Sequence, residues 1–236
     1  MNQDIEKEVL STDNITKSFG NVHALAGVSL NIHEGESVAI MGPSGSGKST
    51  LLHCLSGVLV PESGKVLFRS EDIAAQKDVT RSRLRLSQFG FVFQDGQLIP
   101  ELPARENVAL PLVLTGTLLP KALKRADQLL AELGLSELKK RRPGDMSGGQ
   151  AQRVAIARAL IGNPKVVFAD EPSGALDQAT GYEMMETLTR ETQRCGAALV
   201  LVTHDINVAQ WCSRLIEIRD GKIHSDRALA PQSRRA

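Results

Sequence analysis

One stretch of the chain combines glycines, hydroxyl side chains and a lysine at the spacing of a phosphate-binding loop. Residues 42–50 match the pattern G-x-x-x-x-G-K-[ST] at every fixed position. The glycines let successive backbone N–H groups face a phosphate, Lys48 reaches the β- and γ-phosphates, and the Ser49 hydroxyl is a ligand for Mg²⁺. The loop predicts a nucleoside triphosphate site. Its residues are Gly42, Pro43, Ser44, Gly45, Ser46, Gly47, Lys48, Ser49 and Thr50.

Two adjacent acids follow a buried-strand pattern later in the chain. Asp170 and Glu171 come directly after the apolar run 166–169. Because α/β sheets place ligand sites at the carboxyl ends of their strands, both acids are expected beside the phosphate loop. Asp170 is predicted to hold Mg²⁺, and Glu171 to polarise the attacking water. The pair predicts hydrolysis, and the alternative is an acidic strand end that is merely solvated.

A second candidate anion site lies about a hundred residues after the phosphate loop. Ser147, Gly148, Gly149 and Gln150 precede a helical pattern of apolar residues. Ser147 is a natural N-cap, and the free N–H groups and dipole of a helix start favour an anion. Taken alone, the four residues are better explained by a plain helix cap.

The elements that must position these motifs form an α/β domain. The runs 166–169 and 198–202 are typical of parallel strands covered on both faces. Further strands are predicted at 9–19, 24–32, 37–41, 63–68, 89–93, 215–218 and 222–223, and helices at 51–55, 79–86, 121–133 and 181–194. The first two strands, broken at Gly20-Asn21, predict a small antiparallel β layer.

The chain divides into a core and an insertion. Prolines punctuate residues 95–163, which are expected to form a helical subdomain inserted between core segments 1–94 and 164–226. Residues 1–226 are thus one domain, and 227–236 are predicted to be a disordered tail.

Composition excludes several functions. With 28 Lys+Arg against 27 Asp+Glu the net charge is +1, so no global field attracts nucleic acid, and no direct nucleic-acid partner is expected. The three cysteines are widely spaced and suggest neither disulfides nor a zinc site. The start of the chain does not resemble a secretory signal. The most lipid-like stretch, 108–119, contains Pro111 and falls short of the ~20 apolar residues that span a bilayer, so a cytoplasmic protein with peripheral membrane contact is expected.

In their order along the chain, the motifs resemble the nucleotide-binding subunit of an ABC transporter. The phosphate loop is followed by Ser-Gly-Gly-Gln at 147–150, Asp-Glu at 170–171, Ala-Leu-Asp at 175–177 and Thr-His-Asp at 203–205. The resemblance covers nearly the whole chain and implies a Mg-dependent ATPase with a P-loop NTPase core, a mostly parallel sheet flanked by helices. It also implies a homodimer in which each ATP lies between the phosphate loop of one copy and the Ser-Gly-Gly-Gln of the other.

The family's remaining functional residues correspond to single positions here. Phe19 matches the aromatic residue that stacks on adenine, usually Tyr in the family, although taken alone it could equally be a core residue. Gln94 matches the glutamine that touches Mg²⁺ and the attacking water. His204 matches the histidine that contacts the γ-phosphate, and Asp177 belongs to the loop that crosses the dimer interface. Met146 replaces the Leu that usually precedes Ser-Gly-Gly-Gln in the family.

A finer resemblance is to the macrolide-exporter and lipoprotein-release branch. It rests on residues 89–94, 106–111 and 169–174, with Ser173 in place of the usual Thr. The branch implies an integral membrane permease with a large extracytoplasmic domain and a peripheral location at the cytoplasmic face of the cell (inner) membrane. It implies efflux or extraction of a hydrophobic substrate such as haem, a drug, a lipoprotein or a peptide.

Two other functions remain open from the sequence. One is an ABC-type ATPase of a non-transporting membrane signalling or cell-division complex. The other is a soluble ABC ATPase acting on DNA or ribosomes, which is disfavoured because the motifs occur once and no coiled coil separates them.

The sequence also suggests where a permease docks. Leu98, Ile99 and Leu102 lie in a proline-bearing segment after Gln94, and we expect them either to form a docking groove or to pack inside the helical subdomain. The basic clusters 81–85 and 139–142 are interpreted as solvated faces, with lipid headgroup contact as the alternative.

Overall fold

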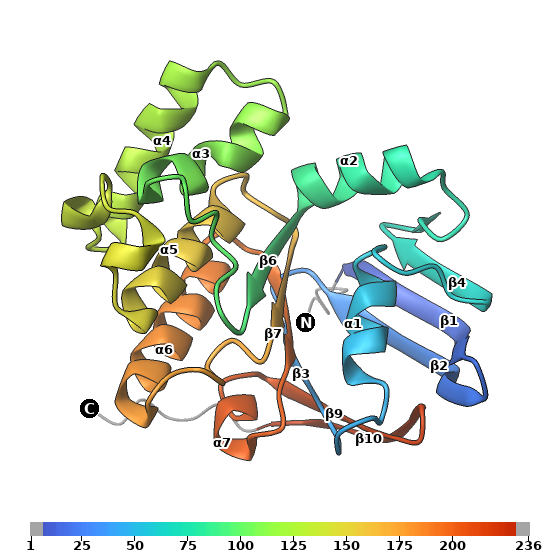
Figure 1. Ribbon diagram of the computed structural model, residues 1–236. Helices are drawn as coiled ribbons and strands as arrows, with labels where there is room; N and C mark the ends of the chain where they lie inside the picture. Colours follow the sequence, from blue (N-terminus) through green and yellow to red (C-terminus); the bar gives the residue numbers. More distant parts are fainter. Residues whose placement is uncertain (1–6, 230–236) are drawn as a thin grey trace, which may run out of the picture.

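The computed structural model describes residues 7–229. A six-stranded sheet runs through the middle of the molecule (Figure 1). Its strand order is β10-β9-β3-β8-β7-β6, and every neighbouring pair is parallel except β10 with β9. The strands are β3 (Ser37–Met41), β6 (Phe89–Phe93), β7 (Val166–Asp170), β8 (Ala198–Val202), β9 (Arg214–Arg219) and β10 (Lys222–Ala228). The carboxyl ends of β3, β8, β7 and β6 therefore meet at one edge, and the predicted α/β fold is confirmed.

Side chains of the sheet alternate between two buried clusters. Val38 and Ile40 point into one cluster and Ala39 into the other, and Phe168 and Val167 separate in the same way. Because both faces are covered, the strands read as continuous apolar runs in the sequence.

The first cluster lies between the sheet and the second, antiparallel sheet (Figure 1). That sheet has the order β2-β1-β4-β5, with β1 (Glu8–Phe19), β2 (Val22–His33), β4 (Ser63–Phe68) and β5 (Glu71–Asp72). Helix α1 (Lys48–Leu55) contacts both sheets and buries Leu51, Leu52 and Leu55 there. The predicted β layer is thus present and supports the helix that follows the phosphate loop.

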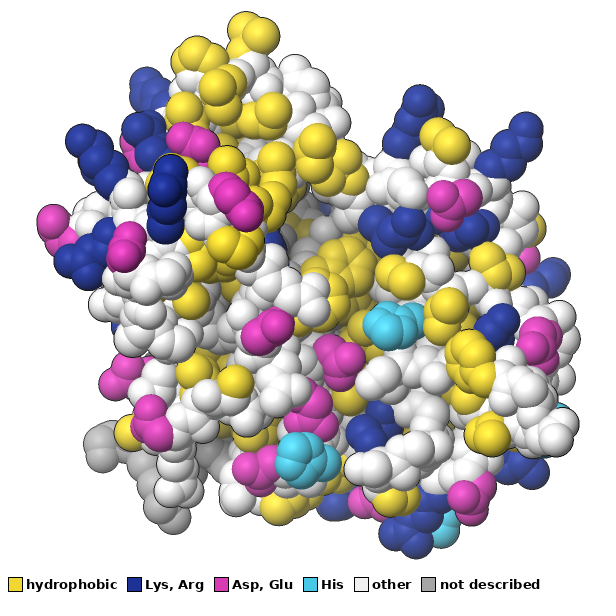
Figure 2. Space-filling view, in the orientation of Figure 1, with side chains coloured by type: hydrophobic (Ala, Val, Ile, Leu, Met, Phe, Trp, Pro, Cys, Tyr) yellow, Lys and Arg dark blue, Asp and Glu magenta, His cyan; other side chains and the backbone are white. Residues whose placement is uncertain are grey.

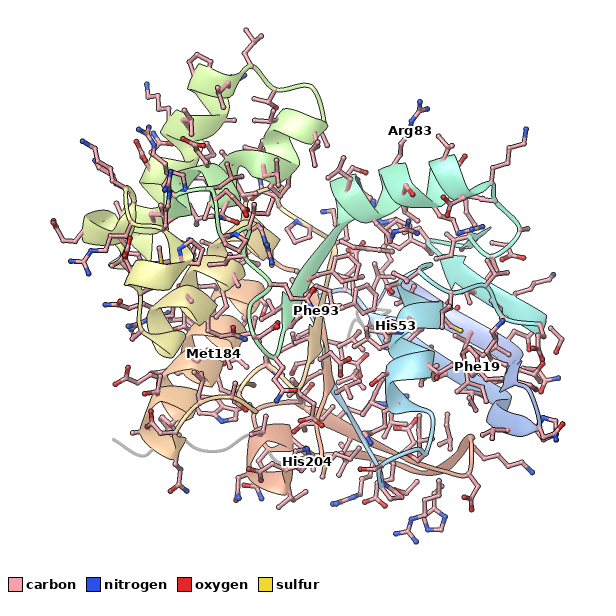
Figure 3. All side chains as sticks on the ribbon, viewed as in Figure 1. Phe19, His53, Arg83, Phe93, Met184 and His204 are labelled. Atoms are coloured by element: carbon pink, nitrogen blue, oxygen red, sulfur yellow. The ribbon has the colours of Figure 1, made fainter. Side chains whose placement is uncertain are left out.

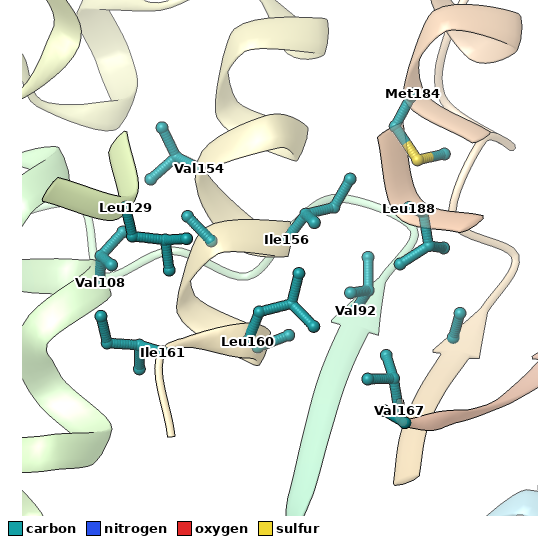
Figure 4. Close-up of a cluster of buried hydrophobic side chains, with 14 of the residues drawn as sticks. Val92, Val108, Leu129, Val154, Ile156, Leu160, Ile161, Val167, Met184 and Leu188 are labelled. Atoms are coloured by element: carbon teal, nitrogen blue, oxygen red, sulfur yellow. The ribbon is translucent and has the colours of Figure 1, made fainter. Parts of the chain in front are cut away.

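The second cluster joins the other face of the sheet to the helical region (Figure 4). It is formed by α3 (Ala104–Leu114), α4 (Leu119–Glu132), α5 (Gly148–Leu160) and α6 (Gln178–Arg194). Val92 and Val167 of the sheet share this cluster with Val154 and Ile156 of α5. The helical region therefore packs on the sheet through one continuous core.

Helix α3 was not predicted as an element. It contains Pro111, which lacks an N–H and normally breaks a helix, so the sequence pattern indicated punctuation instead. The other two α-helices are α2 (Asp78–Gln88) and α7 (Ile206–Ala209). Two short 3-10 helices precede α5, at Ser136–Leu138 and Pro143–Asp145. No helix among residues 7–229 combines the length and apolar character that a bilayer span requires.

The expected disordered tail starts too early. Arg227 pairs with Leu215 and Ala228 with Arg214, so β10 continues past the predicted end of the domain. The guanidinium of Arg214 holds Asp226 at 2.6 Å, which reinforces this hairpin. The prediction of disorder from Arg227 onward is therefore wrong for residues 227 and 228. Positions 230–236 of the predicted tail lie outside the described residues.

Candidate nucleotide site

Four neighbouring strand ends carry the predicted site residues. The phosphate loop follows β3, His204 follows β8, Glu171 follows β7 and Gln94 follows β6. The parallel register places Phe93 opposite Asp170 and Asp170 opposite Val202, so these ends are level. The expectation that the acid pair lies at the same sheet edge as the phosphate loop is confirmed.

The phosphate loop is shaped by close backbone contacts. Gly47, the N-cap of α1, has a φ of 101°, and a Cβ there would lie 2.1 Å from the Ala24 carbonyl oxygen, so only glycine fits. The Lys48 ammonium donates to the carbonyls of Gly42 and Pro43, both at 2.9 Å. The Ser46 hydroxyl is buried without a hydrogen-bond partner. The loop thus presents donors that a phosphate would satisfy.

Asp170 fits a magnesium ligand. Its Oδ1 is buried and has no hydrogen-bond partner, and burial raises the pKa of this carboxyl although a hydrogen bond from Ser49 favours its ionised form. Among residues 7–229 no group of three or more His, Cys, Asp or Glu side chains could hold a metal by itself. Mg²⁺ commonly uses one or two protein ligands together with water and substrate phosphates, so Asp170 and Ser49 suit this ion.

Glu171 contacts two residues at the end of β8. Its Oε1 lies 2.8 Å from Nδ1 of His204, and its Oε2 accepts a hydrogen bond from the Thr203 hydroxyl at 3.4 Å. The Glu171 backbone has a φ of 47°, a conformation that non-glycine residues rarely adopt and that clusters at functional sites. The carboxylate is therefore held in one place at the sheet edge.

Gln94 lies against the chain that follows Glu171. A Cβ at Gly174 would lie 3.0 Å from Nε2 of Gln94, and the Gly174 N–H donates to the Glu171 carbonyl at 3.0 Å. The turn after the acid pair and the side chain after β6 thus pack together.

The residues 147–150 form a capping box at the start of α5. The Ser147 hydroxyl accepts from the Gln150 N–H at 3.3 Å, and Oε1 of Gln150 accepts from the Ser147 N–H at 3.0 Å. The predicted N-cap is confirmed, whereas anion binding at this helix start stays a prediction. Because α5 and α1 pack on opposite faces of the sheet, the cap does not join the phosphate loop of its own chain (Figure 1).

The cap packs instead against the start of α6. A Cβ at Gly149 would lie 2.3 Å from Cγ2 of Thr180, so any side chain at this position would force Thr180 to move. Asp177 is the N-cap of α6, and hydrogen bonds from Thr180 lower the pKa of its carboxyl. Residues 147–150 and 175–180 therefore form one surface.

Comparisons with known proteins agree with this geometry. The family model for ABC transporters matches residues 25–174. The chain belongs to the ABC transporter family. It is an ATPase of that family, because the match includes the phosphate loop and the Asp170–Glu171 strand end described above.

The relatives of this ATPase include transport proteins. The chain is 44% identical to a macrolide export ATP-binding/permease protein from Wolinella succinogenes over 93% of its own length and 34% of the relative's. It therefore spans about a third of that exporter. It is 42% identical to the lipoprotein-releasing system ATP-binding protein of Geobacter metallireducens, over 92% of this chain and 99% of the relative.

A solved dimeric ATP-binding cassette, described as a post-hydrolysis state bound to ADP and Pi, has the same fold. Its TM-score is 0.84 at 41% identity, with 94% of this chain and 99% of that chain covered. The fold of the ATPase is thus that of a cassette found as a dimer with hydrolysis products.

Phe19 is a surface residue. Its side chain is 51% exposed at the end of β1, and the Lys17 ammonium lies 5.7 Å from the ring centroid (Figure 3). The core interpretation of Phe19 is therefore wrong, and an exposed ring is available for stacking.

Two polar residues of α5, one buried and one half-buried, were missed by sequence reasoning. Gln152 is 2% exposed, and its Nε2 donates to the carbonyls of Phe93 and Pro172. Arg158 donates to the carbonyls of Gly96 and Gln97, and burial lowers the pKa of its guanidinium. Their only sequence signal is a polar residue among the apolar positions of a helix.

The segment after Gln94 is held by hydrogen bonds to a side chain of α3. The fully buried Asn107 accepts from the Ile99 N–H at 2.7 Å and donates to the Leu102 carbonyl at 2.8 Å. Leu98 is half-buried and packs against the helical cluster, which favours the core alternative for this residue, whereas a docking role of the segment stays a prediction.

An apolar cavity of about 470 Å³ lies next to the segment that follows Gln94. It appears as a hollow with a hydrophobic floor between α2 and the helical region (Figure 2). Its lining includes Leu86, Phe91, Phe93, Gln97, Pro111 and Arg158.

Proposed function

We propose that this ATPase hydrolyses Mg-ATP between two copies of itself and thereby powers a membrane permease. The observation that carries the proposal is the strand edge at which Glu171 contacts His204 while Oδ1 of Asp170 remains without a partner near Ser49. A base, a phosphate-facing histidine and a metal ligand are the groups that phosphoryl transfer to water requires.

Each residue has a role that follows from its position. Lys48 exchanges its two carbonyl partners for the phosphates of ATP, and Phe19 stacks on the adenine. Glu171 accepts a proton from the attacking water, and Gln94 orients that water from the neighbouring strand end. His204 contacts the γ-phosphate through the ring nitrogen that does not face Glu171.

Asp170, Ser49 and Gln94 would hold the magnesium ion. When bound, the ion supplies charge neutralisation for the β- and γ-phosphates. The protein's contribution is the half-buried carboxylate of Asp170, whose open oxygen already lies at the strand end.

The homodimer follows from the separation of the two half-sites. Residues 147–150 and the phosphate loop lie on helices that cover opposite faces of the sheet, so one chain cannot close them on one ATP. A related cassette at 41% identity is dimeric with ADP and Pi bound, which supports the same arrangement here.

The permease partner is proposed to bind at the apolar cavity between α2 and the helical region, where one of its cytoplasmic helices would lie beside Gln97. The relatives named above export macrolides or release lipoproteins, which favours a transporter over a signalling complex or a DNA- or ribosome-acting ATPase. We therefore propose a permease with an extracytoplasmic domain, a hydrophobic substrate moved out of the membrane, and a peripheral location at the cytoplasmic face.

Light scattering of the full chain tests this function. The Glu171→Gln variant is expected to form a dimer with Mg-ATP, because the bound ATP is no longer hydrolysed and the dimer does not dissociate. Without nucleotide the variant is expected to remain a monomer. Adding Ser147→Arg to that variant should leave ATP binding intact and prevent the dimer. A nucleotide-independent monomer with full ATPase activity would refute the proposal.

A further inference from the structure

Gln152 connects the two strand ends that carry the hydrolytic residues. It lies on α5 with 2% of its surface exposed. Its Nε2 donates to the Phe93 carbonyl at 2.7 Å and to the Pro172 carbonyl at 2.7 Å. A primary amide has two N–H groups, so both are used.

The two carbonyls lie directly beside functional side chains. Phe93 is the last residue of β6 and precedes Gln94, whereas Pro172 follows Glu171. The β6–β7 ladder ends at the pair Phe93 and Asp170. Within the described residues no backbone hydrogen bond joins 94–97 to 171–174, so Gln152 links the two segments where the ladder no longer does.

The same helix holds the segment after Gln94 at a second point. Arg158 donates to the Gly96 carbonyl at 2.7 Å and to the Gln97 carbonyl at 2.6 Å. Helix α5 thus holds this segment at two points. Of the two α5 residues, only Gln152 also bonds to the segment after Glu171. Gln152 is therefore the residue whose loss would change the separation of Gln94 and Glu171.

We propose that Gln152 is a positioning residue for ATP hydrolysis, which sets the distance between Gln94 and Glu171; this inference rests on the proposed roles of those two residues. A water molecule between them is activated only when both side chains are placed correctly, and small misplacements of reacting groups cost large factors in rate. Gln152 is buried and its amide N–H groups are used by the two carbonyls, so its effect is expected on turnover and not on ATP binding.

The competing explanation is that Gln152 merely satisfies two buried carbonyls. In that case its replacement lowers stability, and the folded protein hydrolyses ATP at the normal rate. A positioning role instead makes the effect depend on Glu171, because misplacing a base matters only when the base is present.

The test compares turnover of the full chain in two backgrounds. Gln152→Met keeps the approximate side-chain volume and removes both donors, and it is expected to lower kcat by about 10- to 100-fold with KM for ATP nearly unchanged. In the Glu171→Gln background the same substitution should leave the residual rate within about twofold. Equal losses in both backgrounds, or a folded Gln152→Met variant with wild-type kcat, would overturn the proposal.

Two further variants separate positioning from folding. Gln152→Asn keeps a buried amide that is one methylene shorter and cannot reach both carbonyls, so it also lowers kcat, and it carries the test where Gln152→Met does not fold. Wild-type kcat for Gln152→Asn would contradict the inference. The matched control is Thr192→Val on α6, where a hydroxyl 2% exposed donates only to carbonyls of its own helix, and kcat is expected to stay normal.

The outcome is distinguishable from failure of the proposed function. If Glu171 is not the base, the single variant Glu171→Gln, with Gln152 in place, retains wild-type hydrolysis. Loss of activity in Glu171→Gln together with normal activity in both Gln152 variants would reject only the positioning role.

Discussion

Nδ1 of His204 lies 2.8 Å from Oε1 of Glu171, so residues at the ends of the neighbouring strands β8 and β7 are in direct contact. The His204 side chain is 74% exposed, whereas that of Glu171 is 24% exposed. A neutral imidazole that donates from Nδ1 to the carboxylate leaves Nε2 as an acceptor, and Nε2 can donate to a phosphate oxygen only when it carries a proton itself. With the roles proposed above, the contact links the position of Glu171 as the base to His204 as the residue that contacts the γ-phosphate.

Lys48 and Glu171 are expected to fail in different ways. Lys48→Ala should lose ATP binding, because the only ammonium of the loop is removed. Glu171→Gln should bind ATP normally and lose about 10²-fold or more in turnover, because the amide cannot accept the proton of water. Fluorescent nucleotide binding and phosphate release measure the two effects separately. Wild-type turnover by Glu171→Gln would exclude Glu171 as the base.

Gly149, next to α6, is expected to be sensitive to substitution for a packing reason. In Gly149→Ala the new methyl meets Cγ2 of Thr180, and such overpacking typically costs about 1–3 kcal/mol of stability. The double variant Gly149→Ala, Thr180→Ser removes the Cγ2 methyl of residue 180 and keeps the hydroxyl, which donates to Asp177 at 2.6 Å. Thermal unfolding should show recovery in the double variant. If stability returns and ATPase activity does not, Gly149 also acts at the nucleotide.

Coupling to a permease is expected to depend on the apolar cavity. Leu86→Asp places a charge in its lining and should weaken association with the permease and the hydrolysis that the permease stimulates, with basal hydrolysis unchanged. Leu118→Asp is the matched control, since this residue is 78% exposed and does not line the cavity. Co-purification from membranes and ATPase assays of the complex provide the measurement. Equal coupling by both variants would place the docking site elsewhere.

Leu98 is expected to behave as a core residue. Because its side chain packs against the helical cluster, Leu98→Asp should lower the thermal unfolding midpoint of the isolated chain. A folded Leu98→Asp variant with normal stability that fails only in permease binding would instead restore residues 98–102 as the docking segment.

The three cysteines are expected to differ in reactivity. Cys54 and Cys212 are buried, and burial raises the pKa of their thiols to about 11 and about 12. The thiolate is the reactive form, so neither should be alkylated near pH 8 in the native protein. Cys195 is exposed and should react first, at a rate that increases with pH because burial of part of its side chain also raises its pKa. Peptide mass spectrometry after iodoacetamide treatment checks the order, and denaturant should expose all three.

Local patterns in the sequence were sufficient for the chemistry-bearing motifs. The phosphate loop, the capping box at Ser147 and the apolar strand before Asp170 depend on residues within a few positions of one another, so their types and spacing predict their geometry. Strand positions followed for the same reason, since runs buried on both faces are continuous in sequence. Helix α3 was not predicted because Pro111 obscures its helical pattern. The start of the tail was predicted wrongly because Arg227 pairs with Leu215, which is not a near neighbour in the sequence.

The tertiary structure alone decided which motifs meet. Strand β8 lies between β3 and β7, which brings His204 to Glu171, and no local pattern specifies a strand order. Helices α5 and α1 cover opposite faces of the sheet, which separates residues 147–150 from the phosphate loop of the same chain. Gln152 bonds to carbonyls 59 and 20 residues away in sequence. Backbone carbonyls are present at every position, so only the folded arrangement determines which of them a buried side chain reaches.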